Sequence, residues 1–262
     1  MTNPTLPAVD VIVDETPMSG QFNMTMDAAM LQLGAVRDIS VIRIYRWSVP
    51  TVTMGYFQGA AASLENPFPE LPCVRRLSGG GAILHDNEFT YSCVLPACHP
   101  LRQDPSSLYG LMHASIIEVL NNSGVACCLR SEHEATQRSI GPDNGTTQQS
   151  QEKPDEPFLC FLRQNANDIV HSTGLKIVGS AQRRRKGVTL QHGSILLSTS
   201  PLTPTISGIE QLCPSFDRST LEKNLAPALA TAVGQNWQIR GYDEMELQAF
   251  DQIESLRASD AQ

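Results

Sequence analysis

Two separate stretches of this chain place cationic side chains beside glycines, an arrangement suited to binding an anion or a carbonyl oxygen. In the first, Arg75 and Arg76 are followed by three consecutive glycines, Gly79–Gly81. Glycine has no Cβ atom, so its backbone can lie against a ligand and turn N–H groups toward it. Planar guanidinium groups suit phosphate or carboxylate. The spacing differs from the two common phosphate-binding glycine motifs, and a hairpin that merely turns the chain would fit the same residues.

The second stretch carries a single lysine, Lys176, in an apolar segment between Gly174 and Gly179. Burial would lower the pKa of this amine, whereas a facing anion or carbonyl oxygen would keep it charged. From this segment alone, an edge lysine whose ammonium reaches solvent is the preferred interpretation.

Composition and charge exclude several classes of protein. A length of 262 residues with 41% hydrophobic content suits one large domain or two small ones. The formal net charge of −8 argues against a nucleic-acid binder, which needs a basic face. No apolar stretch is long enough to span a bilayer, and the chain shows no secretory signal. We therefore expect neither nucleic acid nor a membrane as a partner.

The cysteines are more typical of reduced thiols than of a metal or disulfide scaffold. There are seven, an odd number, with no CxxC pair and no His/Cys cluster of zinc-site spacing. We therefore expect a cytoplasmic protein without a structural metal.

The apolar patterns predict one mixed α/β domain with helices covering an open sheet. Helices are expected over residues 23–33, 106–124, 221–233 and 244–256, strands over 41–47, 50–57 and 89–95, and a strand meander over 158–198. Residues 1–20 hold several prolines and are expected to form an extended arm. Residues 131–157 are almost purely polar, which predicts a mobile surface insertion within the domain.

Together, the two glycine-rich stretches closely resemble the signatures of one family. The motifs are Arg75-Arg-x-Ser-Gly-Gly-Gly-Ala and Gly174-x-Lys-Ile-x-Gly-Ser-Ala-Gln, followed by His192-Gly-Ser-Ile-Leu-Leu. They are similar to those of lipoate–protein ligases and octanoyltransferases, which share a catalytic fold with biotin–protein ligases. The resemblance implies a single catalytic domain over residues 1–262, with a flexible insertion at 131–157. Its fold class would be α+β, a mixed, mostly antiparallel sheet flanked by helices.

This resemblance implies an enzyme of protein lipoylation. The chain of octanoate or lipoate would lie in an apolar tunnel beside the glycine loop. Lys176 would point at the acyl carbonyl and stabilise the charge that develops on its oxygen during transfer. A lysine of a lipoyl-domain protein would then attack the carbonyl and form an amide. Biotin ligase is disfavoured because its Gly-Arg-Gly-Arg-type loop is missing from the sequence.

Cys160 favours the octanoyltransferases within this family. It lies just ahead of the Gly-x-Lys strand, similar to where one octanoyltransferase subgroup carries its nucleophile. Such a cysteine would take the acyl group from acyl carrier protein as a thioester, with no cofactor. We also expect no accessory C-terminal domain of the kind that many ATP-using ligases need.

Three features look instead like the ligases. They are the third glycine, Gly81, the pair Asn167-Asp168, and Leu162-Arg-Gln-Asn in place of the proline–serine step that follows the transferase cysteine. In a ligase, ATP and magnesium would convert the free acid to an acyl-adenylate, and Asp168 would lie near the magnesium. Cysteine is also often buried, so Cys160 could be an inert core thiol. The transferase is preferred, with the ATP-dependent ligase second and a non-catalytic acyl-binding protein third.

The resemblance assigns catalytic roles to Lys176 and Cys160. The residues that it places around the acyl ligand are Arg75, Arg76, Ser78, Gly79, Gly80, Gly81, Ala82, His85, Asn167, Asp168, Gly179, Ser180, Ala181, Gln182, His192 and Gly193. For Ser78, His85 and His192, a structural role in turn or strand hydrogen bonds is the simpler interpretation. The basic run Arg183–Lys186 is most simply a solvated hairpin tip. Alternatively, it would dock the acidic acyl carrier protein by electrostatic attraction.

Overall fold

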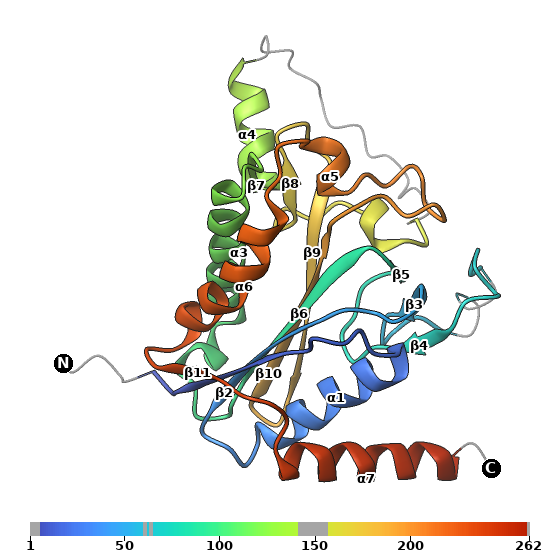
Figure 1. Ribbon diagram of the computed structural model, residues 1–262, viewed down its shortest axis with the longest axis vertical. Helices are drawn as coiled ribbons and strands as arrows, with labels where there is room; N and C mark the ends of the chain where they lie inside the picture. The colour runs from blue at the N-terminus through green and yellow to red at the C-terminus, as the bar shows by residue number, and fades with distance from the viewer. Residues whose placement is uncertain (1–5, 60–61, 63–64, 141–156, 261–262) are drawn as a thin grey trace, which may run out of the picture.

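The computed structural model describes residues 6–59, 62, 65–140 and 157–260. At its centre is an eight-stranded sheet with the order β11-β1-β2-β6-β10-β9-β8-β7 (Figure 1). Its strands are β1 (Val9–Val13), β2 (Ser40–Tyr45), β6 (Glu88–Leu95), β7 (Cys127–Leu129), β8 (Ile169–His171), β9 (Lys176–Arg185), β10 (Val188–Leu196) and β11 (Trp237–Ile239). β1 is parallel to β2 and β11, and the other neighbours are antiparallel. The sheet is therefore mixed and mostly antiparallel, which confirms the predicted fold class.

A second, three-stranded sheet carries the glycine loop. It has the order β4-β3-β5, formed by β4 (Cys73–Arg75), β3 (Thr51–Met54) and β5 (Ile83–His85). β3 is parallel to β4 and antiparallel to β5. The loop over residues 76–82 runs between β4 and β5, so this small sheet holds both of its ends.

Helices cover both faces of the large sheet (Figure 1). α3 (Pro105–Asn122) and α6 (Arg218–Val233) lie on one face, and α1 (Gly20–Leu33) and α7 (Glu244–Asp260) lie on the other. In β2, Ile42 and Ile44 belong to the core beneath α3 and α6, whereas Val41 belongs to the core beneath α1. Alternate residues thus face opposite layers, which explains why every residue of β2 is buried.

Short polar residues begin the long helices. The Oγ atom of Ser19 accepts the N–H of Phe22 at the start of α1, and Asp104 and Asp217 cap α3 and α6 in the same way. Pro227 lies inside α6 without ending it. The remaining elements are short: α4 (Arg130–Ile140), α5 (Ile209–Leu212) and the 3₁₀ turns η1 (Pro100–Gln103) and η2 (Cys160–Leu162).

The structure confirms the predicted helices, strands and β8–β10 meander, but three segments differ from the prediction. Residues 158–161, expected as the first strand of the meander, instead lead into the 3₁₀ turn η2. Residues 1–20 were expected to form an extended arm, yet Val9–Val13 is the buried strand β1, because its apolar residues pack under α6 and pair on both sides. In the polar segment 131–157, residues up to Ile140 continue helix α4. Residues 141–156 lie outside the described part of the chain.

Two further expectations concern the chain as a whole. No helix in the described ranges is long and apolar enough to cross a membrane. All seven cysteines lie within these ranges and are free thiols, as the sequence predicts.

The core beneath α3 gives a direct test of the fold. Leu108 is fully buried, whereas Leu111 on the same helix is 39% exposed. We expect Leu108→Ala to lower the free energy of unfolding by about 2–5 kcal/mol, because it removes buried surface and leaves a cavity. Leu111→Ala is the matched control and should change it by no more than about 0.5 kcal/mol. Urea unfolding measures both; equal losses would contradict the described orientation of α3.

Candidate active site

The glycine loop requires glycine at one of its three positions. Gly80 has a φ of +93°, in the region that residues with a side chain rarely adopt. A Cβ on Gly81 would come within 2.6 Å of the Arg163 guanidinium. A Cβ on Gly79 would make only ordinary contact with Phe57, at 3.5 Å. The loop therefore needs Gly80 for its backbone conformation, whereas a Cβ on Gly81 would only require the end of the Arg163 side chain to move.

Arg76 holds this loop from inside the protein. Its Nη1 donates to the carbonyl of Thr53 at 3.0 Å, and its Nη2 donates to the carbonyls of Gly79 and Gly81 at 2.8 and 2.6 Å. Burial lowers the pKa of Arg76 to about 10, although the neighbouring Cys160 acts in the opposite direction. The guanidinium still carries its charge at neutral pH and is a fixed cation of the site.

Arg75 faces away from Arg76, as expected for adjacent strand residues. Its Nη1 donates to the backbone carbonyls of Gly55 and Gln58, at 2.8 and 2.7 Å, and the residue does not line the cavity described below. Of the basic pair, only Arg76 lies at the site.

A cavity of about 520 Å³ lies where the two predicted stretches meet, within the size range of small-molecule sites. The predicted residues that line it are Arg76, Gly79, Gly80, Gly81, His85, Cys160, Asn167, Asp168, Lys176, Gly179, Ser180, Ala181, Gln182, His192 and Gly193. Arg75, Ser78 and Ala82 do not line it. Apolar surface comes from Met24, Ile83 and Phe161, so one part of the lining could hold an acyl chain.

Cys160 is attached to the end of the glycine loop by backbone hydrogen bonds. The N–H of Ala82 donates to the carbonyl of Phe158 at 3.0 Å, and the N–H of Cys160 donates to the carbonyl of Ala82 at 2.7 Å. The Cys160 Sγ atom lies 3.8 Å from where a Cβ on Gly80 would be. Cys160 is half-buried and lines the cavity, whereas Cys93 is a buried core thiol.

Lys176 opens strand β9, and its ammonium is buried rather than turned to solvent. The Nζ atom lies 2.9 Å from Oδ1 of Asp168, and the two side chains are only 6% and 7% exposed. Nζ also donates to the carbonyl of Cys160 at 3.3 Å and lies 5.1 Å from the centre of the Phe161 ring. The amine, the thiol and the carboxylate thus surround one end of the cavity.

Gly179 provides the space that the lysine occupies. A Cβ on Gly179 would come within 2.7 Å of Cε and 3.1 Å of Nζ of Lys176. The Gly-x-Lys-x-x-Gly spacing therefore has a packing explanation, because the side chain of Lys176 folds back over the backbone three residues later.

Both carboxylate oxygens of Asp168 have partners. Oδ1 pairs with Lys176, and Oδ2 accepts the backbone N–H of Asn165 at 2.8 Å. Within the described ranges, no three His, Cys, Asp or Glu side chains are grouped closely enough to hold a metal ion. Asp168 is thus the ion-pair partner of Lys176 in this structure.

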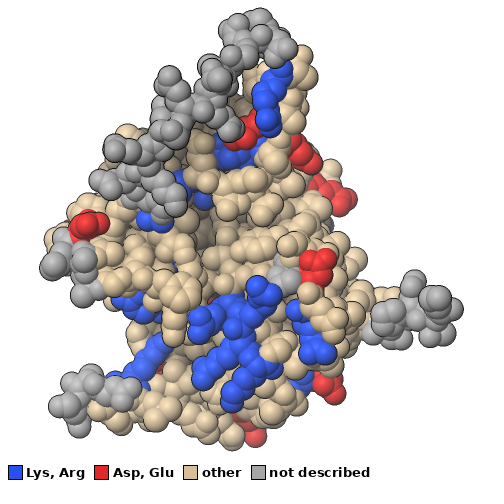
Figure 2. Space-filling view, turned by 180° about the vertical axis from the view of Figure 1, so that it is seen from behind, with Lys and Arg blue, Asp and Glu red and all other residues tan. Residues whose placement is uncertain are grey.

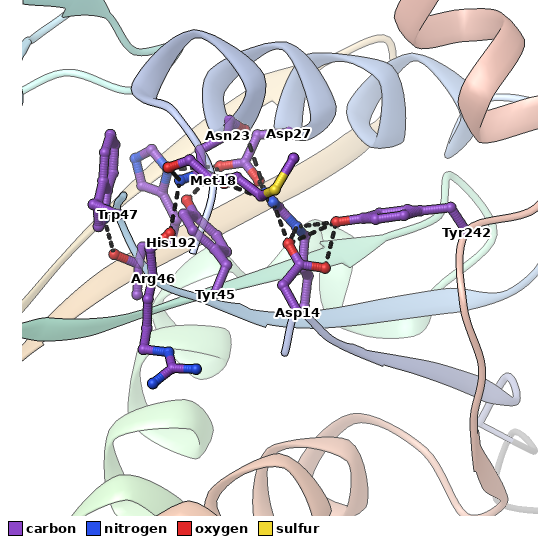
Figure 3. Close-up of polar contacts among 11 residues, drawn as sticks. Asp14, Met18, Asn23, Asp27, Tyr45, Arg46, Trp47, His192 and Tyr242 are labelled. Atoms are coloured by element: carbon purple, nitrogen blue, oxygen red, sulfur yellow. Dashed lines mark hydrogen bonds and ion pairs between the residues drawn. The ribbon is translucent and has the colours of Figure 1, made fainter. Parts of the chain in front are cut away.

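His192 belongs to a buried chain of polar groups that begins on α1 (Figure 3). Its Nδ1 donates to Oδ2 of Asp27 at 3.2 Å, and its Nε2 shares a hydrogen bond with the hydroxyl of Ser78. Burial alone would raise the pKa of Asp27, but the hydrogen bond from His192 and the charge of Arg43 hold it below its ordinary value. His192 and Ser78 therefore connect α1 to the start of the glycine loop.

Arg43 is the charge at the centre of this network. It is completely buried; its Nη2 donates to Asp14 at 2.6 Å and to Asn23 at 2.7 Å, and its Nη1 lies 3.5 Å from Asp27. Its Nε donates to the hydroxyl of Tyr242, which itself donates to Asp14 (Figure 3). The segment after β11 is thus connected to the glycine loop through buried hydrogen bonds.

His85 also has a structural environment. Its Nδ1 donates to Glu88 at 2.7 Å, its Nε2 accepts the hydroxyl of Thr53 at 2.8 Å, and its ring stacks on Trp47 at 3.9 Å. Burial lowers the pKa of His85, with Glu88 acting in the opposite direction. It lines the cavity as a neutral imidazole with both nitrogens engaged.

Sequence reasoning missed His113 and Tyr109 on α3, which also line the cavity. The Nε2 of His113 and the hydroxyl of Tyr91 each lie 2.7 Å from the Oγ of Ser180. Burial raises the pKa of Tyr109 to about 12. The sequence does contain a sign of this pair. Tyr109 and His113 are four residues apart in a predicted helix, and this spacing places both side chains on one face of it.

Asp27→Asn tests the buried network. It removes a negative charge between Arg43 and His192, and breaking such a buried ion pair typically costs about 3–5 kcal/mol. We expect a loss of about 3 kcal/mol in the free energy of unfolding. Asp251→Asn, an exposed carboxylate on α7, should leave stability unchanged. Comparable stability of the two variants in urea unfolding would contradict the role of the network.

His113 makes stability depend on pH. Burial lowers its pKa to about 4 in the folded protein, whereas the unfolded chain has the ordinary value near 6.5. Between these values only the unfolded state takes up the proton, so the free energy of unfolding falls as the pH falls. We expect this residue to account for about 2 kcal/mol of the loss from pH 8 to pH 5.

Chemical unfolding of His113→Gln at both pH values measures this contribution, because the variant should lose that much less stability than the parent protein. Gln137→Ala, at an exposed residue of α4 that does not titrate, is the control and should keep the parent's pH dependence. An unchanged dependence in His113→Gln would show that the folded imidazole is not held neutral.

Comparison with known sequences agrees with this geometry. The family model of the lipoyl protein ligase A/B catalytic domain matches residues 19–226. The octanoyltransferase LipM of Kyrpidia tusciae is 34% identical over 191 residues, 70% of this chain and 64% of that protein. LipM of Bacillus subtilis is 33% identical over 193 residues, with 71% and 64% covered. The chain therefore spans slightly less than two thirds of the length of these curated relatives.

Solved structures share the fold. A Thermoplasma acidophilum lipoate protein ligase, from a study that includes its E2 lipoyl domain, has a TM-score of 0.65 at 18% identity and covers 94% of this chain and 92% of its own. Lipoate-protein ligase A bound with ATP has a TM-score of 0.69 at 20% identity, with 94% of each chain covered. The match over residues 19–226 shows that this chain belongs to the lipoyl protein ligase A/B catalytic domain family.

Proposed function

We propose that this chain is an octanoyltransferase of protein lipoylation that works through a thioester on Cys160. The observation that carries the proposal is the position of Cys160, which lines the same cavity end as Lys176 and the glycine loop. The similarity to proteins named as octanoyltransferases supports this choice. The donor would be octanoyl-acyl carrier protein, and the acceptor a specific lysine of a lipoyl-domain protein.

In the first step, the thiolate of Cys160 attacks the carbonyl carbon of the donor thioester. A new carbon–sulfur bond forms to Sγ, the donor's carbon–sulfur bond breaks, and the released arm leaves as a thiol with the proton that Cys160 gave up. The guanidinium of Arg76 lies close enough to interact with the thiolate charge. The ammonium of Lys176, held by Asp168, provides a fixed positive charge for the carbonyl oxygen as it becomes negative.

In the second step, the neutral amine of the acceptor lysine attacks the acyl-enzyme. Its nitrogen bonds to the carbonyl carbon, the bond to Sγ breaks, and an amine proton passes to the sulfur, which restores the Cys160 thiol. Lys176 serves both steps in the same way because its position does not depend on the leaving group. Met24, Ile83 and Phe161 offer apolar contacts for the chain.

The test must distinguish the octanoyltransferase from the alternative function, an ATP-dependent ligase. Asn167 and Asp168, the pair that resembles the ligases, both line the cavity. A ligase would need no thiol at Cys160. The two functions therefore differ both in their requirement for ATP and in their response to loss of the cysteine.

The test incubates the pure protein with apo lipoyl domain and either octanoyl-acyl carrier protein without ATP, or lipoate with ATP and magnesium. We expect modification in the first mixture, detected by intact mass. Cys160→Ser should reduce it at least about 1000-fold because no thioester can form. Cys73→Ser, at an exposed thiol on β4, should retain activity. Modification in the second mixture that survives Cys160→Ser would identify a ligase instead.

A further inference from the structure

A basic surface surrounds the tip of the β9–β10 hairpin. Arg183 and Arg185 lie on one side of strand β9, Arg184 lies on the other side, as successive strand residues do, and Lys186 lies at the turn, with Arg102 from η1 beside it. Lys186 and Gly187 both have positive φ, of 51° and 82°, and form the turn. Arg102 joins this surface because its Nη1 lies 3.6 Å from where a Cβ on Gly187 would be. Figure 2 shows Lys and Arg side chains gathered on one face, although the chain as a whole carries a net charge of −8.

These cations are not neutralised within the described part of the chain. None of the five forms an ion pair with a described residue. The guanidinium of Arg183 instead lies 4.2 Å from the centre of the Tyr56 ring. Neighbouring like charges repel one another, so an acidic partner would be attracted to this surface and steered onto it.

The basic surface adjoins the cavity. Gln182, the residue before Arg183, lines the cavity. Arg184 lies close enough to Tyr109, another lining residue, to oppose the rise of its pKa. On the other side, Phe57 is 80% exposed and next to Gly79 of the loop. Cations and an exposed aromatic ring therefore border the site, a composition typical of protein interfaces.

We propose that this basic surface docks the acyl donor, an acidic carrier protein that bears its thioester on a flexible phosphodiester-containing arm. The proposal rests on the proposed function. Arg184 is four residues along β9 from Ser180 in the cavity, roughly 13 Å away. A carrier seated on the hairpin would extend its arm along this strand toward Cys160. Arginine forks close to the cavity would bind the phosphate of the arm.

The acceptor fits this position less well. Its lysine is on the folded lipoyl domain and has no long arm, so that domain must approach the cavity itself. The net charge of −8 disfavours nucleic acid as the partner. The positive charge of the surface, its distance from the cavity and its arginine side chains, which suit a phosphate, therefore favour the acyl donor over the lipoyl domain as the partner.

The test compares Arg184→Glu/Arg185→Glu with Arg138→Glu/Lys223→Glu, which makes the same change in net charge at exposed positions on α4 and α6. Two donors are used: octanoyl-carrier protein and the small thioester octanoyl-pantetheine, which has neither protein nor phosphate. Acylation of Cys160 is followed by intact mass. Binding of the fluorescently labelled carrier is measured separately by anisotropy, at low and high salt.

We expect the hairpin variant to lose at least about tenfold in carrier binding and in acylation by the carrier at low salt, with the difference shrinking as salt is added. Acylation by octanoyl-pantetheine should be unchanged, and the control variant should match the parent protein. The proposal would be overturned if the hairpin variant lost acylation equally with both donors, or if its carrier binding were unchanged. It would also be overturned if the variant lost only the transfer of the acyl group onto the lipoyl domain. Carrier binding by the parent protein without acylation would instead overturn the proposed function.

Discussion

A buried cation, the guanidinium of Arg76, organises the site. A charge removed from water is stabilised by hydrogen bonds, and here three backbone carbonyls accept from its two Nη atoms, whereas Nε has no partner among the described residues. Those carbonyls belong to β3 and to the glycine loop, so the same contacts that satisfy the charge hold the loop against the small sheet. Because Ala82 then pairs with Phe158 and Cys160, the position of the thiol also depends on this cation.

The sequence indicates which segments form the site better than it indicates what each side chain does there. The glycines, Lys176 and Cys160 could be found because their types and spacing are unusual, and all of them line one cavity. Arg75 and Arg76 could not be distinguished, since which strand residue points inward depends on packing with distant segments. Asp27 was a similar case: its partner His192 is 165 residues away, a contact that no local pattern contains.

The fold shows the same division between local and distant information. Helices with an apolar stripe, such as α3, were predictable because their pattern repeats within the segment itself. β1 was not, because its pairing partners are β2 and β11, and prolines around it are typical of an extended arm. Helix α4 is almost entirely polar, so it lacks the apolar stripe from which the other helices were predicted.

The pairing of β1 with β11 has a consequence for synthesis on the ribosome. Asp10 of β1 pairs with Gln238 of β11, and its carboxylate accepts a hydrogen bond from the Gln238 side-chain amide, 228 residues later in the chain. One edge of β1 therefore stays unpaired while the intervening residues are translated. At about 5–20 residues per second, this interval is roughly 10–50 s. During it, the segment Val-Asp-Val-Ile-Val presents a free strand edge, the kind of surface that nascent-chain chaperones protect from aggregation.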